Sequence, residues 1–259
     1  MSWVEIQGAR FNCGTDGLAG APALVLSNSL GTNLAMWDEQ MPAFSQQFRV
    51  VRYDSRGHGA SAVTPGPYSI ERLARDVIAL LDTLDIERAH FCGLSMGGAV
   101  GMWLGANVPA RIDRLVLCNT SPKIYSPEVW NTRIDTVRKG GVAAIADAVL
   151  KGWFTAPFHE REPQAVARMR AMLATTPTEG YVGCCAALRD MDQWKALATI
   201  KRPTLVIAGT HDPATPAATA KRMVERIEGS RYVELDAAHI SNVEAAAPFT
   251  ETVTRFLTQ

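Results

Sequence analysis

The sequence predicts an α/β fold, with a mostly parallel central sheet flanked by helices and a helical cap inserted in the second half. Three observations predict it: short apolar runs recur along the chain, helical patterns separate them, and this alternation is broken once, over residues 121–192. Strands that alternate with helices build parallel sheets through right-handed crossovers. We therefore expect a core domain made of residues 1–120 and 193–259, with residues 121–192 as the cap.

Six short apolar runs are the expected core strands. Each is rich in Val, Leu, Ile or aromatic side chains, which is typical of strands buried on both faces. They are residues 23–27, 50–53, 89–92, 115–118, 204–208 and 232–235. Ahead of them, residues 3–13 predict two edge strands joined by a short turn, and residues 16–22 form a loop with Gly and Pro.

Helices are expected between these strands. Over residues 69–84, apolar side chains recur at steps of three and four, which gives one apolar stripe, and Ser69 is the expected N-cap. Further helices should begin at Met96 and run from about Glu244 to Leu257. The segment 121–192 lacks strand-like runs and is mostly helical in composition. Open α/β sheets bind ligands at the carboxyl ends of their strands, so we expect this insertion to cover that edge. Extra helices packed on a flank are the alternative.

Composition argues against several classes of function. The 26 basic and 26 acidic residues cancel, so no electrostatic argument favours a nucleic-acid or membrane partner. The first residues lack the features of a signal peptide, and no apolar run reaches bilayer length. The five cysteines form no CxxC pair, and Cys92 and Cys118 lie in strand-like runs as small buried side chains. We expect a cytoplasmic monomer or small homo-oligomer.

The segment GLSMG at residues 93–97 matches the pattern G-x-S-x-G. A strand that turns sharply into a helix leaves its serine strained and exposed, and bulky flanking residues would clash there. Here a predicted strand precedes the pattern and a predicted helix follows it, which is the required context. Ser95 is therefore the expected nucleophile. A glycine-rich turn with an idle serine is the alternative.

A serine hydroxyl needs a general base at neutral pH, and His239 is the expected one. It follows the last predicted strand and precedes the final helix, as the third member of the order Ser, acid, His should. The other four histidines fit less well: His90 lies inside a strand, His58 lies in a loop upstream of the nucleophile, His159 lies in the insertion, and His211 neighbours the candidate acid.

The acid should follow another central strand, and Asp212 comes directly after the run at residues 204–209. It would accept a hydrogen bond from His239 and stabilise the imidazolium that forms during attack. The preceding strand ends in Asn119, which cannot serve as an acid. Asp236 is near His239 in sequence, and we expect it to pack its loop instead.

Two backbone N–H groups should bind the developing oxyanion. One should come from Met96, the residue after the nucleophile. The loop SNSLGT at residues 27–32 should supply the other, and Leu30 is the expected donor.

Several segments now assembled resemble the α/β-hydrolase superfamily over the whole chain. They are SNSLGTNLAMW, YDSRGHGAS, CGLSMGG, GTHD and DAAHISNVE. Within it, SNSLGTNLAMW and CGLSMGG are most similar to the 3-oxoadipate enol-lactonases of bacterial aromatic catabolism. Many relatives carry His-Gly where this chain has Asn28 and Ser29.

The resemblance implies a small anionic enol-lactone as substrate, opened by water through an acyl-enzyme, with no metal or organic cofactor. The substrate's free carboxylate needs a partner, and Arg133 could bind it bidentately, with Trp130 and Trp153 as further lining candidates. Asp54 and Arg56 are expected to brace loops. Insertion arginines usually lie on a solvated face and tryptophans usually pack, which is the alternative for these candidates.

Two other functions fit the same residues. The first is another serine enzyme of this fold: a carboxylesterase, a haloperoxidase-like perhydrolase or a carbon–carbon bond hydrolase. The second is a non-catalytic ligand receptor, since some proteins of this fold only bind ligands. Epoxide hydrolases and haloalkane dehalogenases are disfavoured because they use aspartate where this chain has Ser95.

Overall fold

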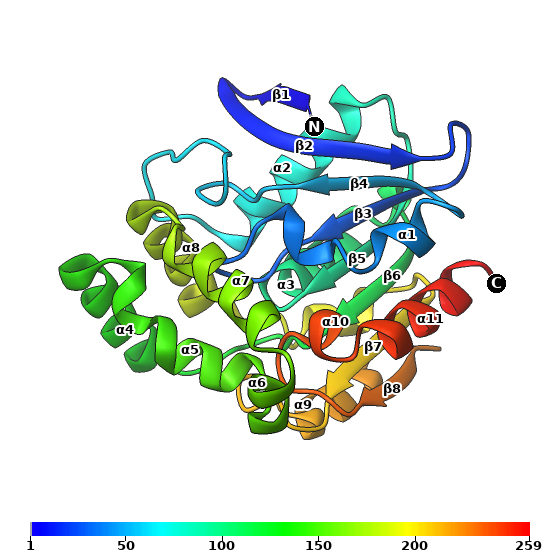
Figure 1. The fold of residues 1–259 in the computed structure, drawn as a ribbon. Helices are drawn as coiled ribbons and strands as arrows, with labels where there is room; N and C mark the ends of the chain where they lie inside the picture. Colours follow the sequence, from blue (N-terminus) through cyan, green and yellow to red (C-terminus); the bar gives the residue numbers. More distant parts are fainter. Residues whose placement is uncertain (1) are drawn as a thin grey trace.

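The computed structural model describes residues 2–259 and contains an eight-stranded sheet. The strand order is β1-β2-β4-β3-β5-β6-β7-β8 (Figure 1). β2 pairs antiparallel with both β1 and β4, and all other neighbours are parallel. The strands are β1 Ser2–Ile6, β2 Ala9–Gly17, β3 Ala23–Ser27, β4 Arg49–Tyr53, β5 Ala89–Leu94, β6 Ile112–Cys118, β7 Thr204–Gly209 and β8 Arg231–Leu235.

Helices cover both faces of this sheet, with α2 and α3 on one face and α1 and α11 on the other (Figure 1). Between β6 and β7 the chain forms α4 to α8, which we call the helical insertion and which lies beyond the carboxyl ends of the parallel strands (Figure 1). The helices are α1 Met41–Phe44, α2 Ile70–Thr83, α3 Met96–Asn107, α4 Pro127–Gly140, α5 Ala146–Trp153, α6 Ala156–Arg161, α7 Pro163–Ala174, α8 Thr178–Asp190, α9 Ala217–Val224, α10 Ser241–Glu244 and α11 Ala246–Leu257.

The predicted fold class is confirmed, and so is the alternation of strands and helices. The Ser69 side chain caps α2 by accepting the backbone N–H of Arg72 at 3.1 Å. Two local predictions were wrong. β2 continues to Gly17, into the segment expected to be a loop, because it pairs with β4 there. β8 is only partly buried, since it is the last strand of the sheet. The final helix ends at Leu257 as predicted and begins at Ala246, after the short α10 and the non-helical Ala245 with its φ of −119°.

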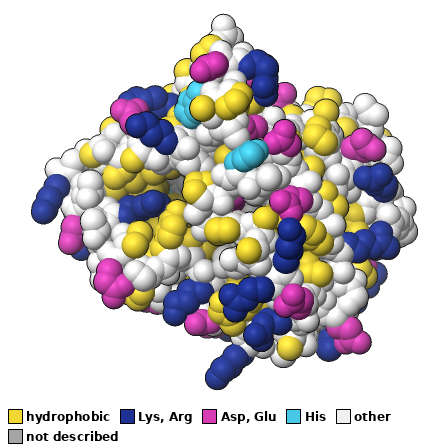
Figure 2. Space-filling model, turned by 90° about the horizontal axis from the view of Figure 1, so that it is seen from below, with side chains coloured by type: hydrophobic (Ala, Val, Ile, Leu, Met, Phe, Trp, Pro, Cys, Tyr) yellow, Lys and Arg dark blue, Asp and Glu magenta, His cyan; other side chains and the backbone are white. Residues whose placement is uncertain are grey.

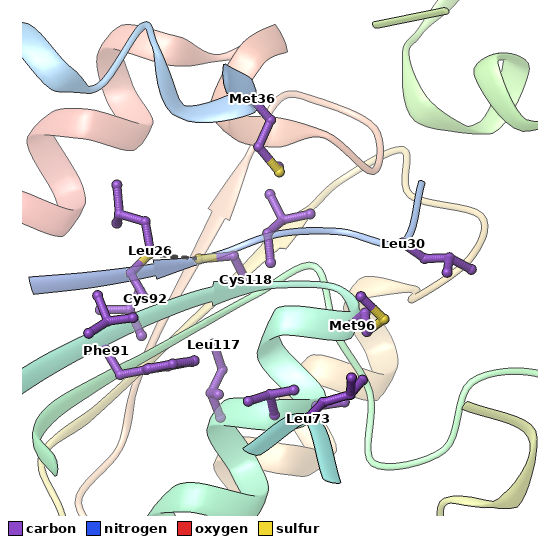
Figure 3. Close-up of a cluster of buried hydrophobic side chains, with 14 of the residues drawn as sticks. Leu26, Leu30, Met36, Leu73, Phe91, Cys92, Met96, Leu117 and Cys118 are labelled. Atoms are coloured by element: carbon purple, nitrogen blue, oxygen red, sulfur yellow. Dashed lines mark hydrogen bonds between the residues drawn. The ribbon is translucent and has the colours of Figure 1, made fainter. Parts of the chain in front are cut away.

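The hydrophobic core lies on both faces of the central strands. Phe91 of β5 and Leu117 of β6 are fully buried on one face, and Leu26 of β3 is fully buried on the other face, beside Cys92 (Figure 3). Burying a side chain of this size contributes about 1.5–3 kcal/mol. The Sγ atoms of Cys92 and Cys118 lie 3.9 Å apart in this layer (Figure 3), and all five cysteines are buried thiols. The cysteines of the central strands therefore pack as small apolar groups, as expected.

The surface mixes charges of both signs. On the face seen in Figure 2, basic and acidic side chains are interspersed, and several basic side chains lie together near the lower edge of the view. Within residues 2–259, no helix combines the length and the apolar character needed to cross a membrane.

Candidate active site

Ser95 lies at the sharp turn between β5 and α3, in the middle of the sheet. Its φ of +57° and ψ of −111° are strained for a residue with a side chain. The backbone is so close here that a Cβ on Gly93 would lie 2.2 Å from the carbonyl oxygen of Gly97. A Cβ on Gly97 would lie 2.2 Å from the carbonyl oxygen of Ser27. Both glycines of the motif are therefore required by contact with backbone.

Three side chains that are far apart in sequence form one hydrogen-bonded chain. Nε2 of His239 lies 2.9 Å from Oγ of Ser95, and Nδ1 of His239 lies 2.8 Å from Oδ2 of Asp212. A carboxylate only accepts hydrogen bonds, so Nδ1 carries the proton and Nε2 is free to accept from the serine hydroxyl. All three residues are buried, with 4–5% of their surface exposed. This arrangement is able to remove the serine proton during nucleophilic attack.

The carboxylate of Asp212 is held by four further groups. Oδ2 accepts from the Thr215 hydroxyl at 2.6 Å and from Nδ2 of Asn119 at 3.0 Å. Oδ1 accepts the backbone N–H groups of Ala214 and Thr215 at 2.8 and 3.0 Å. Burial opposes ionisation, but the charge of His239 and the hydrogen bonds outweigh it and hold the pKa of Asp212 below its ordinary value. Asp212 is therefore ionised at neutral pH.

Asn119 joins the acid to the histidine loop, a role that the sequence analysis missed. Its Nδ2 donates to Oδ2 of Asp212 and also to the Ala238 carbonyl oxygen, both at 3.0 Å. Its Oδ1 accepts from the Ser241 hydroxyl at 2.5 Å. The side chain thus fixes the distance between the loop that carries Asp212 and the loop that carries His239.

Asn119→Ala should reduce kcat about 10- to 100-fold, because a hydrogen bond to a charged group contributes about 1.5–3 kcal/mol. Loss of a donor to the carboxylate should raise the pKa of Asp212 toward its ordinary value, which still lies well below neutral pH, so the loss of kcat should be present throughout the neutral range. Thr215→Val is the matched variant, since it removes another donor to the same oxygen but leaves the histidine loop attached. Turnover measured across pH checks the prediction. An Asn119→Ala enzyme with the wild-type profile would contradict it.

The backbone N–H groups of Leu30 and Met96, the two expected oxyanion donors, differ from the adjacent N–H groups in their hydrogen bonding. On either side of Leu30, the Ser29 N–H points to Sδ of Met36 and the Gly31 N–H donates to Nε2 of His58. On either side of Met96, the N–H groups of Ser95 and Gly97 donate to the carbonyls of Cys118 and Asn28. Within the described residues, no acceptor is recorded for the N–H of Leu30 or of Met96.

Comparison with known proteins agrees with this geometry. Residues 22–246 match the sequence family described as the alpha/beta hydrolase fold. The chain belongs to the α/β-hydrolase family. It is 44% identical to 3-oxoadipate enol-lactonase 2 of Acinetobacter baylyi, over 95% of this chain and 92% of that protein. The crystal structure of the enol-lactonase from Burkholderia xenovorans LB400 superposes with a TM-score of 0.98 at 50% identity, over the full length of both chains. A putative carbamate hydrolase RutD of Stutzerimonas stutzeri is 33% identical, over 89% of each chain.

This α/β hydrolase has a cavity of about 180 Å³ between the turn that carries Ser95 and the helical insertion. Ser95, His239 and Leu30 line it, and so do all three predicted substrate-binding candidates, Arg133, Trp130 and Trp153. Tyr125 and Tyr181 also line it and were missed. Both tryptophans are largely buried, and the indole N–H of Trp130 donates to the Ile124 carbonyl at 2.6 Å.

Arg133 contributes a basic side chain to the lining of this cavity. Its guanidinium lies 5.1 Å from the ring centre of Trp130 and 5.7 Å from that of Tyr125. Across the described residues, no carboxylate forms an ion pair with it. The positive charge is therefore held against aromatic faces, without a protein anion that neutralises it.

The helical insertion of this α/β hydrolase is attached to the histidine loop at two points. Oε1 of Glu244 accepts the Thr155 N–H at 3.0 Å and also the Thr155 hydroxyl, while Oε2 accepts the Ala238 N–H at 2.7 Å. The N–H of Ile240 donates to the Trp153 carbonyl at 3.1 Å. The wall of the cavity and the loop that carries His239 therefore share direct hydrogen bonds.

The remaining candidates lie outside this hydrogen-bonded chain. His211 is half exposed and pairs with the exposed Asp236 at 2.9 Å, so Asp236 is a loop residue as expected. His90 is buried in β5 with its Nδ1 3.4 Å from Asp113, and Nε2 of His159 lies 3.1 Å from the Leu150 carbonyl.

Asp54 and Arg56 brace loops, as expected. The Asp54 carboxylate accepts the Leu34 N–H at 2.8 Å and the Ala60 N–H at 2.9 Å. The Arg56 guanidinium forms a two-point ion pair with the buried Asp76. Within residues 2–259, no group of three or more His, Cys, Asp and Glu side chains is arranged to hold a metal ion.

Proposed function

We propose that this chain hydrolyses the enol-lactone of 3-oxoadipate to 3-oxoadipate through an acyl-enzyme on Ser95. The observation that carries the proposal is the hydrogen-bonded chain from Ser95 through His239 to Asp212, whose Ser95 and His239 line a small cavity together with an arginine. The full-length similarity to enol-lactonases at 44 and 50% identity supports the choice of substrate.

The first half-reaction forms the acyl-enzyme on Ser95. Oγ of Ser95 attacks the lactone carbonyl while Nε2 of His239 takes the hydroxyl proton, and Asp212 stabilises the imidazolium. The N–H groups of Leu30 and Met96 bind the oxyanion, since they are backbone donors without another acceptor. Collapse of the tetrahedral intermediate breaks the ring C–O bond. The leaving enol oxygen takes the proton from His239, and the enol then becomes the ketone.

The second half-reaction releases the product. Water enters the cavity and gives a proton to His239 as it attacks the acyl group on Ser95. The second tetrahedral intermediate uses the same two N–H donors, and its collapse returns the proton to Ser95 and frees the carboxylic acid. None of these steps requires a metal or an organic cofactor.

The helical insertion acts as the cap of this enzyme, and Arg133 on α4 binds the free carboxylate of the substrate. An arginine without a protein carboxylate partner is available for a bidentate pair with such an anion. The surrounding rings of Trp130, Trp153 and Tyr181 exclude water and strengthen the pair. We also place the enzyme in the reducing cytoplasm, because all five cysteines are thiols, and we expect a monomer or small homo-oligomer.

Arg133→Ala should raise KM for the enol-lactone with little change in kcat, at a cost of about 1.5–3 kcal/mol in kcat/KM. The charge would bind a part of the substrate that does not react, so it stabilises ground state and transition state alike. Arg138→Ala, an exposed arginine of the same helix, is the control. Hydrolysis of a neutral aryl ester by Arg133→Ala should stay close to wild type. Equal loss on both substrates would exclude a role in carboxylate binding.

Steady-state turnover of the enol-lactone and of a simple aryl ester by the purified protein tests the proposed function. A much higher kcat/KM for the enol-lactone is the expected result. A preference for the neutral ester would instead favour a general carboxylesterase. No turnover, together with no covalent labelling of Ser95 by a fluorophosphonate, would favour a ligand receptor.

A further inference from the structure

In the loop that carries Leu30, two successive peptide groups are each fixed by their own hydrogen bonds. A trans peptide unit points its C=O and its N–H in opposite directions, so holding one end fixes the direction of the other. The carbonyl of Ser29 accepts both the Thr32 N–H at 3.2 Å and the Thr32 hydroxyl at 2.8 Å. Those bonds set the plane of the Ser29–Leu30 peptide, whose N–H is the proposed oxyanion donor.

The next peptide, Leu30–Gly31, is held by a histidine that the mechanism does not otherwise use. The Gly31 N–H donates to Nε2 of His58 at 2.9 Å. Nδ1 of the same ring lies 3.3 Å from the Arg56 carbonyl, so Nδ1 carries the proton and Nε2 is the acceptor. The imidazole is fully buried. The two peptides that flank the Cα of Leu30 are thus fixed by different partners, Thr32 on one side and His58 on the other.

We propose that His58 is a positioning residue for the oxyanion hole, and that its neutral Nε2 holds the Leu30–Gly31 peptide so that the Leu30 N–H stays directed at the reacting carbonyl. This inference rests on the proposed function, since it needs an oxyanion at Ser95. His58 would affect the reaction through the backbone of residues 29–31, because its ring does not line the cavity.

The surroundings of His58 keep the ring neutral and immobile. Burial, opposed only in part by the Arg56 carbonyl and the charge of Asp54, lowers the pKa of His58 to about 4. The ring lies against α8, with its Nδ1 4.0 Å from Sγ of Cys184 and its centre 6.5 Å from that of Tyr181. Next to it, a Cβ on Gly57 would lie 2.4 Å from the Cα of Gly180, so the backbones of this loop and of α8 are in direct contact.

His58→Leu should lower kcat/KM for the enol-lactone about 10- to 100-fold, less than the ~100- to 1,000-fold loss on removing an oxyanion donor, because the donor is only displaced. Affinity for a boronic acid, which forms a tetrahedral adduct with the serine, should fall by the same factor, while affinity for the product 3-oxoadipate should hold. His58→Gln, which offers an acceptor oxygen near the position of Nε2, should recover most of the loss. His90→Leu, a buried histidine outside the site, is the control and should match wild type per active site.

Rates are expressed per site labelled by a fluorophosphonate, so that a poorly folding variant does not count as a slow one. A His58→Leu enzyme equal to wild type per site, or a His58→Gln enzyme as slow as His58→Leu, would overturn the inference. So would a boronate affinity that does not change with kcat/KM.

A second measurement needs no variant. In ¹⁵N-labelled wild-type protein, scalar coupling across the Gly31 N–H···Nε2 hydrogen bond should be detected in the free enzyme and should persist in the boronate adduct. Absence of the coupling in either state would overturn the inference. If the wild-type protein turned over no enol-lactone and Ser95 took no label, the proposed function itself would fail. An active wild type with an unaffected His58→Leu variant would reject the inference alone.

Discussion

Ser95→Ala is expected to reduce kcat for the enol-lactone by about a million-fold and to leave the fold intact. In the proposed mechanism the hydroxyl forms the acyl-enzyme, and alanine offers no substitute. The fold should survive because the backbone strain at Ser95 is supported by its own hydrogen bonds, from the Ser95 N–H to Cys118 at 2.9 Å and from the Thr120 hydroxyl to the Ser95 carbonyl at 2.8 Å. Neither bond involves the Ser95 side chain.

Single-turnover kinetics and intact-protein mass spectrometry check this prediction together. The fluorophosphonate adduct of the wild type should be absent from Ser95→Ala and present in Ser230→Ala, a variant remote from the cavity. A Ser95→Ala protein that retained a few per cent of wild-type turnover would show that another nucleophile performs the reaction.

Asp212→Asn should lower kcat by about ten thousand-fold, as expected when the acid of such a chain becomes an amide. The amide can donate an N–H to Nδ1 of His239. The imidazole would then carry its proton on Nε2, and Nε2 could no longer accept the proton of Ser95. The substitution also removes the negative charge that offsets the imidazolium. KM should change little, since Asp212 does not line the cavity.

Asp236→Asn is the matched control, because Asp236 is the other aspartate close to His239 in sequence. Its side chain is 94% exposed and pairs with His211 at the surface, so its amide variant should turn over substrate like the wild type. Steady-state kinetics of both variants decide between the two acids. The assignment of Asp212 would be wrong if Asp236→Asn were the slower enzyme.

The sequence alone predicts the core of this fold and the chain of three residues well, because both depend on local signals. Ser95 is marked by its glycines and by the strand and helix around it, and Asp212 and His239 each follow a strand of a parallel sheet. The carboxyl ends of parallel strands meet at one edge, so order along the chain becomes proximity in space.

The supporting residues could not be predicted in the same way, because their roles come from contacts between loops. Asn119 could be rejected as an acid, but its two donors and one acceptor acquire partners only when three loops meet. His58 is separated by 27 residues from the peptide that it holds. Tyr181 lies in α8, and only the packing of α8 against the core brings its ring to the cavity.

The bonds from Glu244 and Ile240 to the cavity wall have a consequence for how such an enzyme acquires new substrates. Replacing whole helices of the insertion would disturb the loop that carries His239 at the same time, so selectivity and turnover would change together. Diversification in this lineage should therefore proceed by exchanging individual side chains that face the bound molecule, while the segment Trp153–Thr155 and its carboxylate partner are retained.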